Sequence, residues 1–507
     1  MKRTFRLLSL LWSLSSLTTL GQTVEKYDQP YRPQIHFSPK AHWMNDPNGM
    51  VYLNNTYHLY FQYYPKGTTW GPMHWGHATS KDLMRWEEQP IALYPDKLGY
   101  IFSGSAVADL NNTSGFGRYG IVPLVAIFTS HDPVGEKQGK SNFQTQSIAY
   151  SLDGGKTWDK YEGNPVLRNP GITDFRDPKV NWYKAGKKWV MTLATKDRIT
   201  FYSSPDLKSW SKESEFGEGV GGHGGVWECP DLFPLTLAGK TYWVLIVNIN
   251  PGGPNGGSAT QYFIGDFDGS KFTPLTTEIK WLDYGPDEYA GVTWSNTGDR
   301  RIFLGWMSNW QYANQVPTDP WRSAMTIPRD LSLRSIDGNY FLCSQPVKEI
   351  DNVVTKELSF KNLLIKEELD LSQKVKSADS LYMIKFSAAQ LQSFALVLSN
   401  DAGEEAVIGY DRTANQYYFD RTRSGKIDFE KGFGKRLTAP RISKDSTTDI
   451  TLIVDLASAE LFADKGLTVM TGIFFPTKSF NRLTIRSKEG LSIDRLTYSK
   501  MKSAWNR

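Results

Sequence analysis

The chain has 507 residues, which is more than one ordinary domain needs and suits two or three. Its formal net charge is +5, but the first 21 residues hold three basic side chains and no acidic ones, so the rest carries +2. A nearly neutral chain gives no electrostatic basis for binding nucleic acid or an anionic membrane, and we exclude both as partners.

Aromatic residues make up 13% of the chain, including 17 Trp and 25 Tyr. Such a composition is typical of surfaces that stack on sugar rings, and equally of an aromatic β core. The two cysteines, Cys229 and Cys343, form no disulfide framework, and either pairing or free thiols are possible. The seven histidines lack the spacing of zinc sites, so we expect no bound metal and no cofactor.

Residues 1–21 are predicted to be a secretory signal peptide. Lys2, Arg3 and Arg6 form a basic start, residues 7–20 are mostly apolar, and Gly21 offers a small residue for cleavage. An uncleaved anchor is the alternative, but the segment is short and rich in Ser and Thr for a membrane span. We therefore expect a secreted protein, extracellular or periplasmic, with no membrane contact after cleavage.

The first notable motif is residues 43–49, Trp-Met-Asn-Asp-Pro-Asn-Gly. Pro47 disfavours the helical region for Asp46, and the Asn-Gly pair that follows favours a sharp turn. We therefore expect Asp46 at the end of a strand, beside a tight turn, with Trp43 and Asn45 close by. A plain loop is the alternative for this motif alone.

A degenerate repeat runs through the first part of the chain. Each copy begins with a turn-forming Asp and ends on a large aromatic residue, and the copies are residues 80–86, 151–158, 204–210 and 266–272. The terminal aromatics are 72, 52 and 62 residues apart, a period that suits one four-stranded propeller blade. About 290 residues at this period predict five blades. Short apolar runs predict strands at 51–52, 57–60, 125–128 and 242–247.

A composition change divides the chain. Fifteen of the 17 Trp lie between Trp43 and Trp321, and none lies in residues 322–504. We therefore predict an all-β fold with three parts: a five-bladed β-propeller, a linker and a C-terminal β-sandwich, at residues 30–335, 336–355 and 356–505.

The C-terminal part reads as short strands with polar turns. Residues 381–386 and 394–398 are predicted strands, and residues 450–456 lead through a turn at 457–460 to a second hairpin strand at 461–462. Few residues there suit catalysis. A supporting role is expected, with sugar binding as the alternative.

Two further carboxylates stand in similar contexts. Asp177 precedes a proline, as Asp46 does, and the adjacent Arg176 either lowers the pKa of Asp177 or binds sugar hydroxyls. Glu228 lies in an extended segment between Trp227 and Cys229, surroundings that suit a general acid. Strand alternation would point both of its neighbours away from it. On successive blades, all three carboxylates would face the propeller axis.

These motifs, in this order, resemble glycoside hydrolase family 32, the invertases, exo-inulinases, levanases and related fructosyltransferases. The resemblance extends over about residues 34–500 and includes further motifs at 61–65, 75–78, 102–105 and 455–461. It implies a five-bladed propeller followed by a β-sandwich.

The resemblance also implies catalytic roles. Asp46 would be the nucleophile, Glu228 the acid and base, and Asp177 a stabiliser of the transition state together with Arg176. Double displacement with retention would then place Asp46 and Glu228 about 5–5.5 Å apart.

Further pocket residues follow from the same resemblance. Asn45, Gln62 and Ser103 are expected to bind hydroxyls, with Phe102 packed beside them. The expected pocket walls, for which core packing is the alternative, are Trp43, Trp70 and Trp310. More weakly supported positions around the site are Asp109, Asp174, Asp231 and Glu288.

The implied activity is release of terminal fructose from β-fructans such as levan and inulin, and from sucrose. A fructosyltransferase on the same scaffold is one alternative, and a five-bladed arabinan-type hydrolase that inverts configuration is another. A non-catalytic glycan-binding propeller is the alternative from a different class. The sequence leaves the preferred substrate, the oligomeric state and strict exo action open.

Overall fold

The computed structural model describes residues 27–376 and 380–505. The helical elements of these ranges are all short: α1 (Pro133–Lys137), α2 (Leu371–Val375) and the 3-10 helix η1 (Lys348–Val353). The remaining elements are strands, so the prediction of an all-β fold is confirmed. The predicted signal peptide, residues 1–21, lies outside the described residues.

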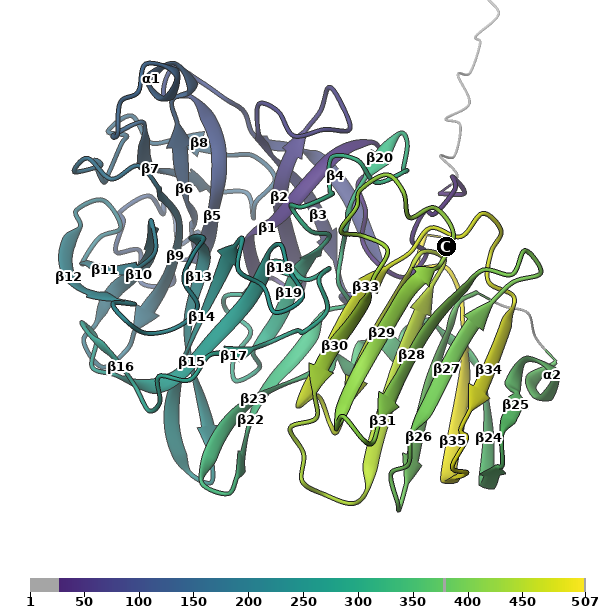
Figure 1. Cartoon of the computed structure of the whole chain (residues 1–507). Helices are drawn as coiled ribbons and strands as arrows, with labels where there is room; N and C mark the ends of the chain where they lie inside the picture. The colour runs from purple at the N-terminus through teal and green to yellow at the C-terminus, as the bar shows by residue number, and fades with distance from the viewer. Residues whose placement is uncertain (1–26, 377–379, 506–507) are drawn as a thin grey trace, which may run out of the picture.

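Five sheets follow one another along the N-terminal part of the described chain, and together we call them the N-terminal module (Figure 1). Sheet 1 contains β20 (Trp321–Arg322), β1 (His42–Leu53), β2 (Thr56–Tyr64), β3 (His74–Ser80) and β4 (Trp86–Leu93). Sheet 2 contains β5 (Tyr100–Ala108), β6 (Leu124–His131), β7 (Gln144–Ser151) and β8 (Asp159–Lys160). Sheet 3 contains β9 (Phe175–Tyr183), β10 (Lys188–Thr195), β11 (Ile199–Ser204) and β12 (Ser211–Phe216).

The last two sheets of this module carry short extra strands. Sheet 4 contains β13 (Val226–Leu237), β14 (Lys240–Asn250), β15 (Ala259–Phe267), β16 (Phe272–Pro274) and β17 (Lys280–Trp281). Sheet 5 contains β18 (Tyr289–Thr293), β19 (Ile302–Met307), β21 (Ala324–Met325), β22 (Arg329–Ile336) and β23 (Asn339–Pro346). The strands predicted at 51–52, 57–60, 125–128 and 242–247 fall in β1, β2, β6 and β14.

The strands β1, β5, β9, β13 and β18, which we call the inner strands, lie next to one another in that order, and β18 also contacts β1. The late strand β20 pairs in parallel with β1, so the two ends of the module meet in sheet 1. This closed ring is consistent with a β-propeller.

The four predicted repeat segments occupy one equivalent position, between the third and fourth strands of sheets 1 to 4. In each copy an aspartate Oδ1 accepts hydrogen bonds from two backbone N–H groups that lie two to four residues further on, and the aspartates are Asp82, Asp153, Asp206 and Asp268. Each copy of the repeat is therefore the same kind of turn, in which the Asp side chain accepts hydrogen bonds from the backbone of a tight bend.

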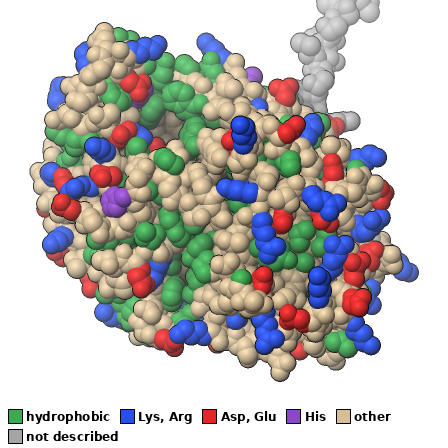
Figure 2. Space-filling view, in the orientation of Figure 1, with side chains coloured by type: hydrophobic (Ala, Val, Ile, Leu, Met, Phe, Trp, Pro, Cys, Tyr) green, Lys and Arg blue, Asp and Glu red, His purple; other side chains and the backbone are tan. Residues whose placement is uncertain are grey.

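The C-terminal module consists of two six-stranded sheets (Figure 1). Sheet 6 contains β24 (Val354–Ile365), β35 (Leu491–Met501), β26 (Tyr382–Ala388), β31 (Thr448–Asp455), β32 (Ser458–Ala463) and β33 (Thr468–Ile473). Sheet 7 contains β25 (Glu368–Asp370), β34 (Arg482–Arg486), β27 (Phe394–Ser399), β28 (Glu405–Asp411), β29 (Gln416–Arg423) and β30 (Arg436–Pro440). Residues from both sheets share one hydrophobic cluster. Basic and acidic side chains alternate over the face of this module that Figure 2 shows.

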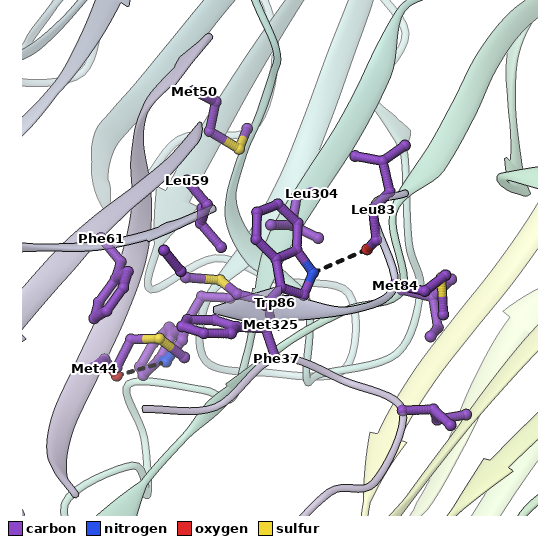
Figure 3. Close-up of a cluster of buried hydrophobic side chains, with 14 of the residues drawn as sticks. Phe37, Met44, Met50, Leu59, Phe61, Leu83, Met84, Trp86, Leu304 and Met325 are labelled. Atoms are coloured by element: carbon purple, nitrogen blue, oxygen red, sulfur yellow. Dashed lines mark hydrogen bonds between the residues drawn. The ribbon is translucent and has the colours of Figure 1, made fainter. Parts of the chain in front are cut away.

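A second hydrophobic cluster joins the two modules. Figure 3 shows part of it, with Phe37 and Trp86 packed among methionine and leucine side chains of the N-terminal module. Met383, Ile453 and Met501 of sheet 6 belong to the same cluster. The modules therefore bury a common apolar surface, which favours a fixed arrangement of one against the other.

Charged side chains are also buried at this junction. Arg329 of β22 contacts Asp283 at 3.0 Å and Glu460 of β32 at 2.6 Å, and His36 contacts Glu460 and Asp455, each at 2.8 Å. All five side chains have no exposed surface. Removing one member would leave a buried charge without its partner, which is strongly destabilising.

The structure differs from the predicted linker and hairpin turn. Residues 336–355 include all of β23, which pairs with β22 in sheet 5, and η1, which buries Ile350 and Val353. The change in Trp content thus does not coincide with a break in the strands. In the hairpin, Asp455 pairs with Ser458, so Glu460 lies inside β32 rather than in the turn.

Candidate active site

Every inner strand carries a one-residue bulge. In β1, for example, two residues lie between Met44 and Pro47, whereas one residue lies between their partners in β2. The other four inner strands have the same extra residue at the corresponding place. The residues within these bulges are Asn45 and Asp46, Phe102 and Ser103, Asp177 and Pro178, Cys229 and Pro230, and Ala290 and Gly291. A bulge redirects side chains locally, which explains why the predicted residues gather here.

The first motif is therefore not a strand end followed by a turn. Residues 43–49 lie within the continuous strand β1, and a second register shift between Asn48 and Val51 absorbs the Asn-Gly pair. Gly49 has a φ of +51°, and a Cβ at this position would lie 2.7 Å from the rings of Trp75 and Tyr60. The turn-forming residues thus serve bulges rather than a reversal of the chain.

A cavity of about 340 Å³ opens at these bulges. Ten of the eleven predicted site residues line it, namely Asn45, Asp46, Gln62, Trp70, Phe102, Ser103, Arg176, Asp177, Glu228 and Trp310. Trp43 does not: it is fully buried, its indole N–H donates to Asn45 at 2.8 Å, and its ring stacks on that of Trp310 at 5.8 Å. Trp43 thus packs behind the cavity wall instead of forming it.

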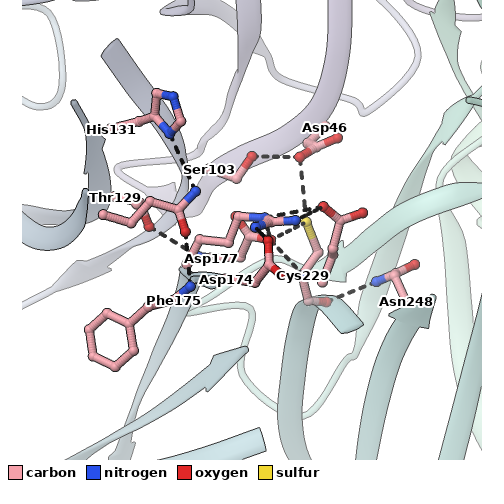
Figure 4. Close-up of polar contacts among 12 residues, drawn as sticks. Asp46, Ser103, Thr129, His131, Asp174, Phe175, Asp177, Cys229 and Asn248 are labelled. Atoms are coloured by element: carbon pink, nitrogen blue, oxygen red, sulfur yellow. Dashed lines mark hydrogen bonds and ion pairs between the residues drawn. The ribbon is translucent and has the colours of Figure 1, made fainter. Parts of the chain in front are cut away.

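Asp46 has donors on both carboxylate oxygens. Ser103 donates to Oδ2 at 2.6 Å (Figure 4). The side-chain amide of Asn45 donates to Oδ1 at 2.9 Å. Burial raises the pKa of Asp46, as does the charge of Glu228, while these two hydrogen bonds oppose the rise. The hydrogen bonds orient a carboxylate that burial would otherwise disfavour.

Cys229 connects Asp46 with Asp177. Its Sγ lies 3.5 Å from Asp46 Oδ2 and 3.7 Å from Asp177 Oδ2, and its backbone N–H donates to Asp177 Oδ2 at 3.1 Å (Figure 4). Strand alternation predicts only that Cys229 points away from Glu228; its φ of +42° within the bulge breaks the alternation and directs Sγ at the other two carboxylates of the site. Cys229 and Cys343 both lie among the described residues, and neither forms a disulfide.

Asp177 does not have the lowered pKa that its neighbour suggested. Burial raises the pKa of Asp177 to about 7, outweighing the opposing charge of Arg176, and the charges of Glu228 and Asp46 add to the rise. The Arg176 Nε lies 4.0 Å from Asp177 Oδ2, so the two side chains are only loosely paired.

Arg176 is instead directed at Glu228. Nε and Nη2 of Arg176 donate to Glu228 Oε1 at 3.2 and 2.8 Å, and the hydroxyl of Tyr289 donates to Oε2. Arg176, Glu228 and Tyr289 each immediately precede the bulge of β9, β13 and β18. Equivalent positions on three neighbouring strands thus form one hydrogen-bonded row across the ring.

The other predicted positions divide between the wall and the interior. Trp70 packs edge-on against Phe102 at 6.1 Å, and Gln62 donates to Asn48 at 2.7 Å from the cavity wall. Among the weaker predictions, Asp174 lines the cavity and pairs with Arg176. The remaining three lie elsewhere: Asp109 caps a turn at Thr113 and Ser114, Asp231 pairs with Lys179, and Glu288 is buried with its pKa raised to about 8 by burial.

Sequence reasoning missed a group of residues contributed by sheet 2 and the loop that carries α1. The cavity is also lined by His131, Glu136, Phe143 and Gln144. The hydroxyl of Tyr289, in β18, donates a hydrogen bond to Glu228. The available signals were Asp132-Pro133, an Asp-Pro pair like those at Asp46 and Asp177, and the short spacing between His131 and Glu136.

Comparison with known proteins places this site in a family. Residues 36–346 match the model of the glycosyl hydrolases family 32 N-terminal domain, and residues 349–502 match that of the family 32 C-terminal domain. The chain belongs to glycosyl hydrolase family 32. It is therefore a glycoside hydrolase.

Relatives of this family 32 chain align over most of its length. A levanase of Bacillus subtilis is 45% identical over 99% of this chain and 75% of the levanase, and an extracellular exo-inulinase of Aspergillus niger is 42% identical over 95% of this chain and 96% of that protein. The crystal structure of an exo-inulinase from Aspergillus awamori superposes with a TM-score of 0.86 at 38% identity, covering 95% of this chain and all of that one. These similarities confirm the predicted family.

None of the helices in residues 27–376 and 380–505 combines the length and the hydrophobicity needed to cross a bilayer.

Proposed function

We propose that this family 32 enzyme is a secreted, retaining β-fructosidase that removes terminal non-reducing fructose from β-fructans such as levan and inulin, and from sucrose. The observation that carries the proposal is the convergence of Asp46, Asp177 and Glu228 on one cavity, with Cys229 Sγ between the first two. The levanase and the exo-inulinases among its relatives support the same substrate class.

The reaction we propose has two displacements at the anomeric carbon of fructose. In the first, Asp46 attacks this carbon while Glu228 gives its proton to the glycosidic oxygen, so a fructosyl ester forms and the leaving sugar departs. In the second, Glu228 takes a proton from water, and the water oxygen displaces Asp46. Two inversions at one carbon give net retention.

Asp177 acts on the sugar during both displacements, while Arg176 holds Glu228 in position. The transition state resembles an oxocarbenium ion, and carboxylates held by the protein stabilise the developing positive charge. Asp177 is fixed by the backbone N–H of Cys229 and donates its own N–H to Thr129 at 3.1 Å, so it can hold fructose hydroxyls without reorganising. Asn45, Gln62 and Ser103 would bind further hydroxyls, with Phe102, Trp70 and Trp310 as apolar walls.

The architecture we infer for this function is a five-bladed propeller and a β-sandwich. The ring of inner strands, one from each of sheets 1 to 5, supports five blades, and the cluster shared by sheets 6 and 7 supports the sandwich. We place the division between the two domains after Pro346, since β23 pairs within sheet 5 and β24 within sheet 6. Export is supported by the signal-like pattern of residues 1–21 and by relatives named as extracellular.

The deciding experiment incubates the purified protein separately with sucrose, inulin and levan and separates the products by chromatography. We expect free fructose from the earliest time points and no oligosaccharides of intermediate length. Growing oligofructans would indicate a fructosyltransferase, and binding without turnover would indicate a glycan-binding protein. Proton NMR of the first-formed sugar should show the β-anomer, whereas the opposite anomer would exclude retention.

A further inference from the structure

The exposure of four of the five carboxylates that line the cavity orders these four by depth. The side chain of Asp177 is 5% exposed, that of Glu228 is 18% exposed, that of Asp174 is 24% exposed and that of Glu136 is 53% exposed. All four line the same cavity. Asp177 thus marks its floor and Glu136 its mouth.

This order has a consequence for the substrate, if the proposed function holds. The acid protonates the oxygen between the fructosyl unit and the leaving sugar, so that oxygen lies beside Glu228. The fructosyl unit occupies the deeper side, near Asp177 and near Asp46, since Cys229 Sγ contacts both of these carboxylates. The leaving sugar then lies on the side of the mouth, where Glu136 is the most exposed carboxylate.

Glu136 is held in place at the mouth by His131. Its Oε2 lies 3.1 Å from His131 Nε2, and the ring of His131 is stacked on that of Phe102 at 4.1 Å with 7° between the planes. Gln144 approaches the other ring nitrogen, with its Nε2 3.4 Å from His131 Nδ1, while its Oε1 accepts from the backbone N–H of Phe175. The site wall thus fixes the imidazole on three sides.

The hydrogen-bond partners also define the proton of His131. The amide nitrogen of Gln144 can only donate, so Nδ1 accepts and the proton lies on Nε2, directed at the Glu136 carboxylate. Within the described residues, the second oxygen of Glu136, Oε1, has no hydrogen-bond partner. A half-exposed carboxylate with one oxygen anchored and one available is suited to accept a hydrogen bond from a sugar hydroxyl.

We propose that Glu136 determines specificity for the leaving group by accepting a hydrogen bond from a hydroxyl of the departing sugar. It takes no part in bond cleavage. Its contribution therefore exists only for substrates whose leaving group carries sugar hydroxyls.

The test compares two substrates with the same fructosyl unit. Sucrose and short inulin oligomers have sugar leaving groups, whereas methyl β-D-fructofuranoside releases methanol. Glu136→Gln keeps the size of the side chain and removes its charge, and Glu136→Ala removes the acceptor. Glu162→Gln is the matched control, because Glu162 is an exposed carboxylate outside the cavity lining, in the loop that follows β8.

We expect both Glu136 variants to lose about tenfold in kcat/KM on sucrose and the oligomers, the loss typical for a hydrogen bond to a charged group, and to keep wild-type kcat/KM on the methyl fructoside. Glu162→Gln should behave as wild type on all of them. Equal losses on both substrate classes, or no loss on either, would overturn the assignment. Failure of the wild-type protein to release fructose from any substrate would instead reject the proposed function itself, and melting temperatures report folding of each variant.

Discussion

The guanidinium of Arg176 donates two hydrogen bonds to a single oxygen of Glu228, from Nε at 3.2 Å and from Nη2 at 2.8 Å. The hydroxyl of Tyr289 donates a hydrogen bond to the other carboxylate oxygen. The position of Glu228 is thus defined from both sides by groups on the neighbouring strands β9 and β18. A proton donor that must alternate between a glycosidic oxygen and a water benefits from such a fixed orientation.

Arg176→Lys should separate charge from geometry at this contact. Lysine keeps the positive charge but lacks the planar guanidinium, whose Nε and Nη2 both donate to one oxygen of Glu228. We expect kcat for sucrose to fall about 10- to 100-fold, consistent with the loss of charge-assisted hydrogen bonds, with a nearly unchanged melting temperature. Arg198→Lys, at a surface ion pair of the same module, is the control and should retain activity. A change of less than twofold in Arg176→Lys would show that charge alone suffices.

Asp46→Asn and Glu228→Gln should each lose several orders of magnitude in turnover. The first removes the nucleophile, and the second removes the only group placed to protonate the leaving oxygen in our mechanism. Each replacement is close in shape, so circular dichroism spectra should match those of the wild type. Steady-state assays on sucrose measure the loss, with the exposed Asp159→Asn as control. Near-normal turnover in either variant would refute the assigned roles.

The defect of Glu228→Gln should also depend on the leaving group. A p-nitrophenolate leaves without full protonation, so p-nitrophenyl β-D-fructofuranoside should lose much less in its first displacement than sucrose does. Asp46→Asn should lose activity on both substrates alike. Identical losses on both substrates for Glu228→Gln would contradict its role as the acid.

Asp177 connects the site with the stability of the fold. Its pKa is about 7 in the folded protein, against 3.8 for the ordinary side chain, mainly because of burial. Between these values the folded state holds a proton that the unfolded state lacks, so this contribution to stability is complete below pH 3.8 and is lost as the pH rises through 7. Asp177→Asn resembles the protonated acid at every pH.

The melting temperature of Asp177→Asn should therefore approach that of the wild type near pH 4 and exceed it at pH 7 and above. The corresponding gain in unfolding free energy at pH 7 should be at least about 1 kcal/mol. Thermal unfolding at pH 4, 5.5 and 7 measures it. Parallel curves for the two proteins would show that Asp177 is ionised in the fold throughout this range.

The sequence motifs predicted the residues of the site better than the backbone that carries them. Asp-Pro and Asn-Gly pairs signal departures from regular strands, but a turn and a bulge share these signals, so the sequence alone predicts a strand end and a tight turn at residues 43–49. The bulge is decided by how many residues the neighbouring strand offers, for instance Met44 to Pro47 against Tyr63 to Phe61. That count depends on pairing over a distance and leaves no local mark.

The ion-pair partner of Arg176 and the pKa of Asp177 likewise depend on the fold and not on neighbouring residues in the sequence. Arg176 and Asp177 are adjacent in sequence, yet the guanidinium turns to Glu228, which is 52 residues away, and burial controls the pKa of Asp177. The Asp-led turns at Asp82, Asp153 and Asp206 were readable because their hydrogen bonds close within four residues. Local chemistry was thus predictable, and the row of Arg176, Glu228 and Tyr289 required the sheets to be placed side by side.

His36 provides a test of the junction between the two modules. Its ring is fully buried, with Nδ1 2.8 Å from Asp455 Oδ2 and Nε2 2.8 Å from Glu460 Oε1. Burial alone would lower the pKa of His36, but the hydrogen bonds and charges of the two carboxylates outweigh it and raise this pKa from 6.5 to about 9. The stabilisation from the bound proton is then complete below pH 6.5 and is lost as the pH rises through 9.

His36→Asn should accordingly be most destabilised at pH 6, by about 3 kcal/mol from the pKa difference alone, and less so at pH 10. The difference in unfolding free energy between the variant and the wild type should be smaller at pH 10 than at pH 6, but it should not vanish. Asp455 and Glu460 stay buried and lose a hydrogen-bond donor at every pH, although Arg329 still contacts Glu460. Denaturant unfolding at the two pH values measures both the pH-dependent contribution of the bound proton and the pH-independent contribution of the lost hydrogen bonds. His223→Asn, a partly exposed histidine of the N-terminal module, is the control and should stay close to wild type at both. A gap of equal size at pH 6 and pH 10 would mean that His36 is neutral in the folded protein and that its contribution lies in packing alone.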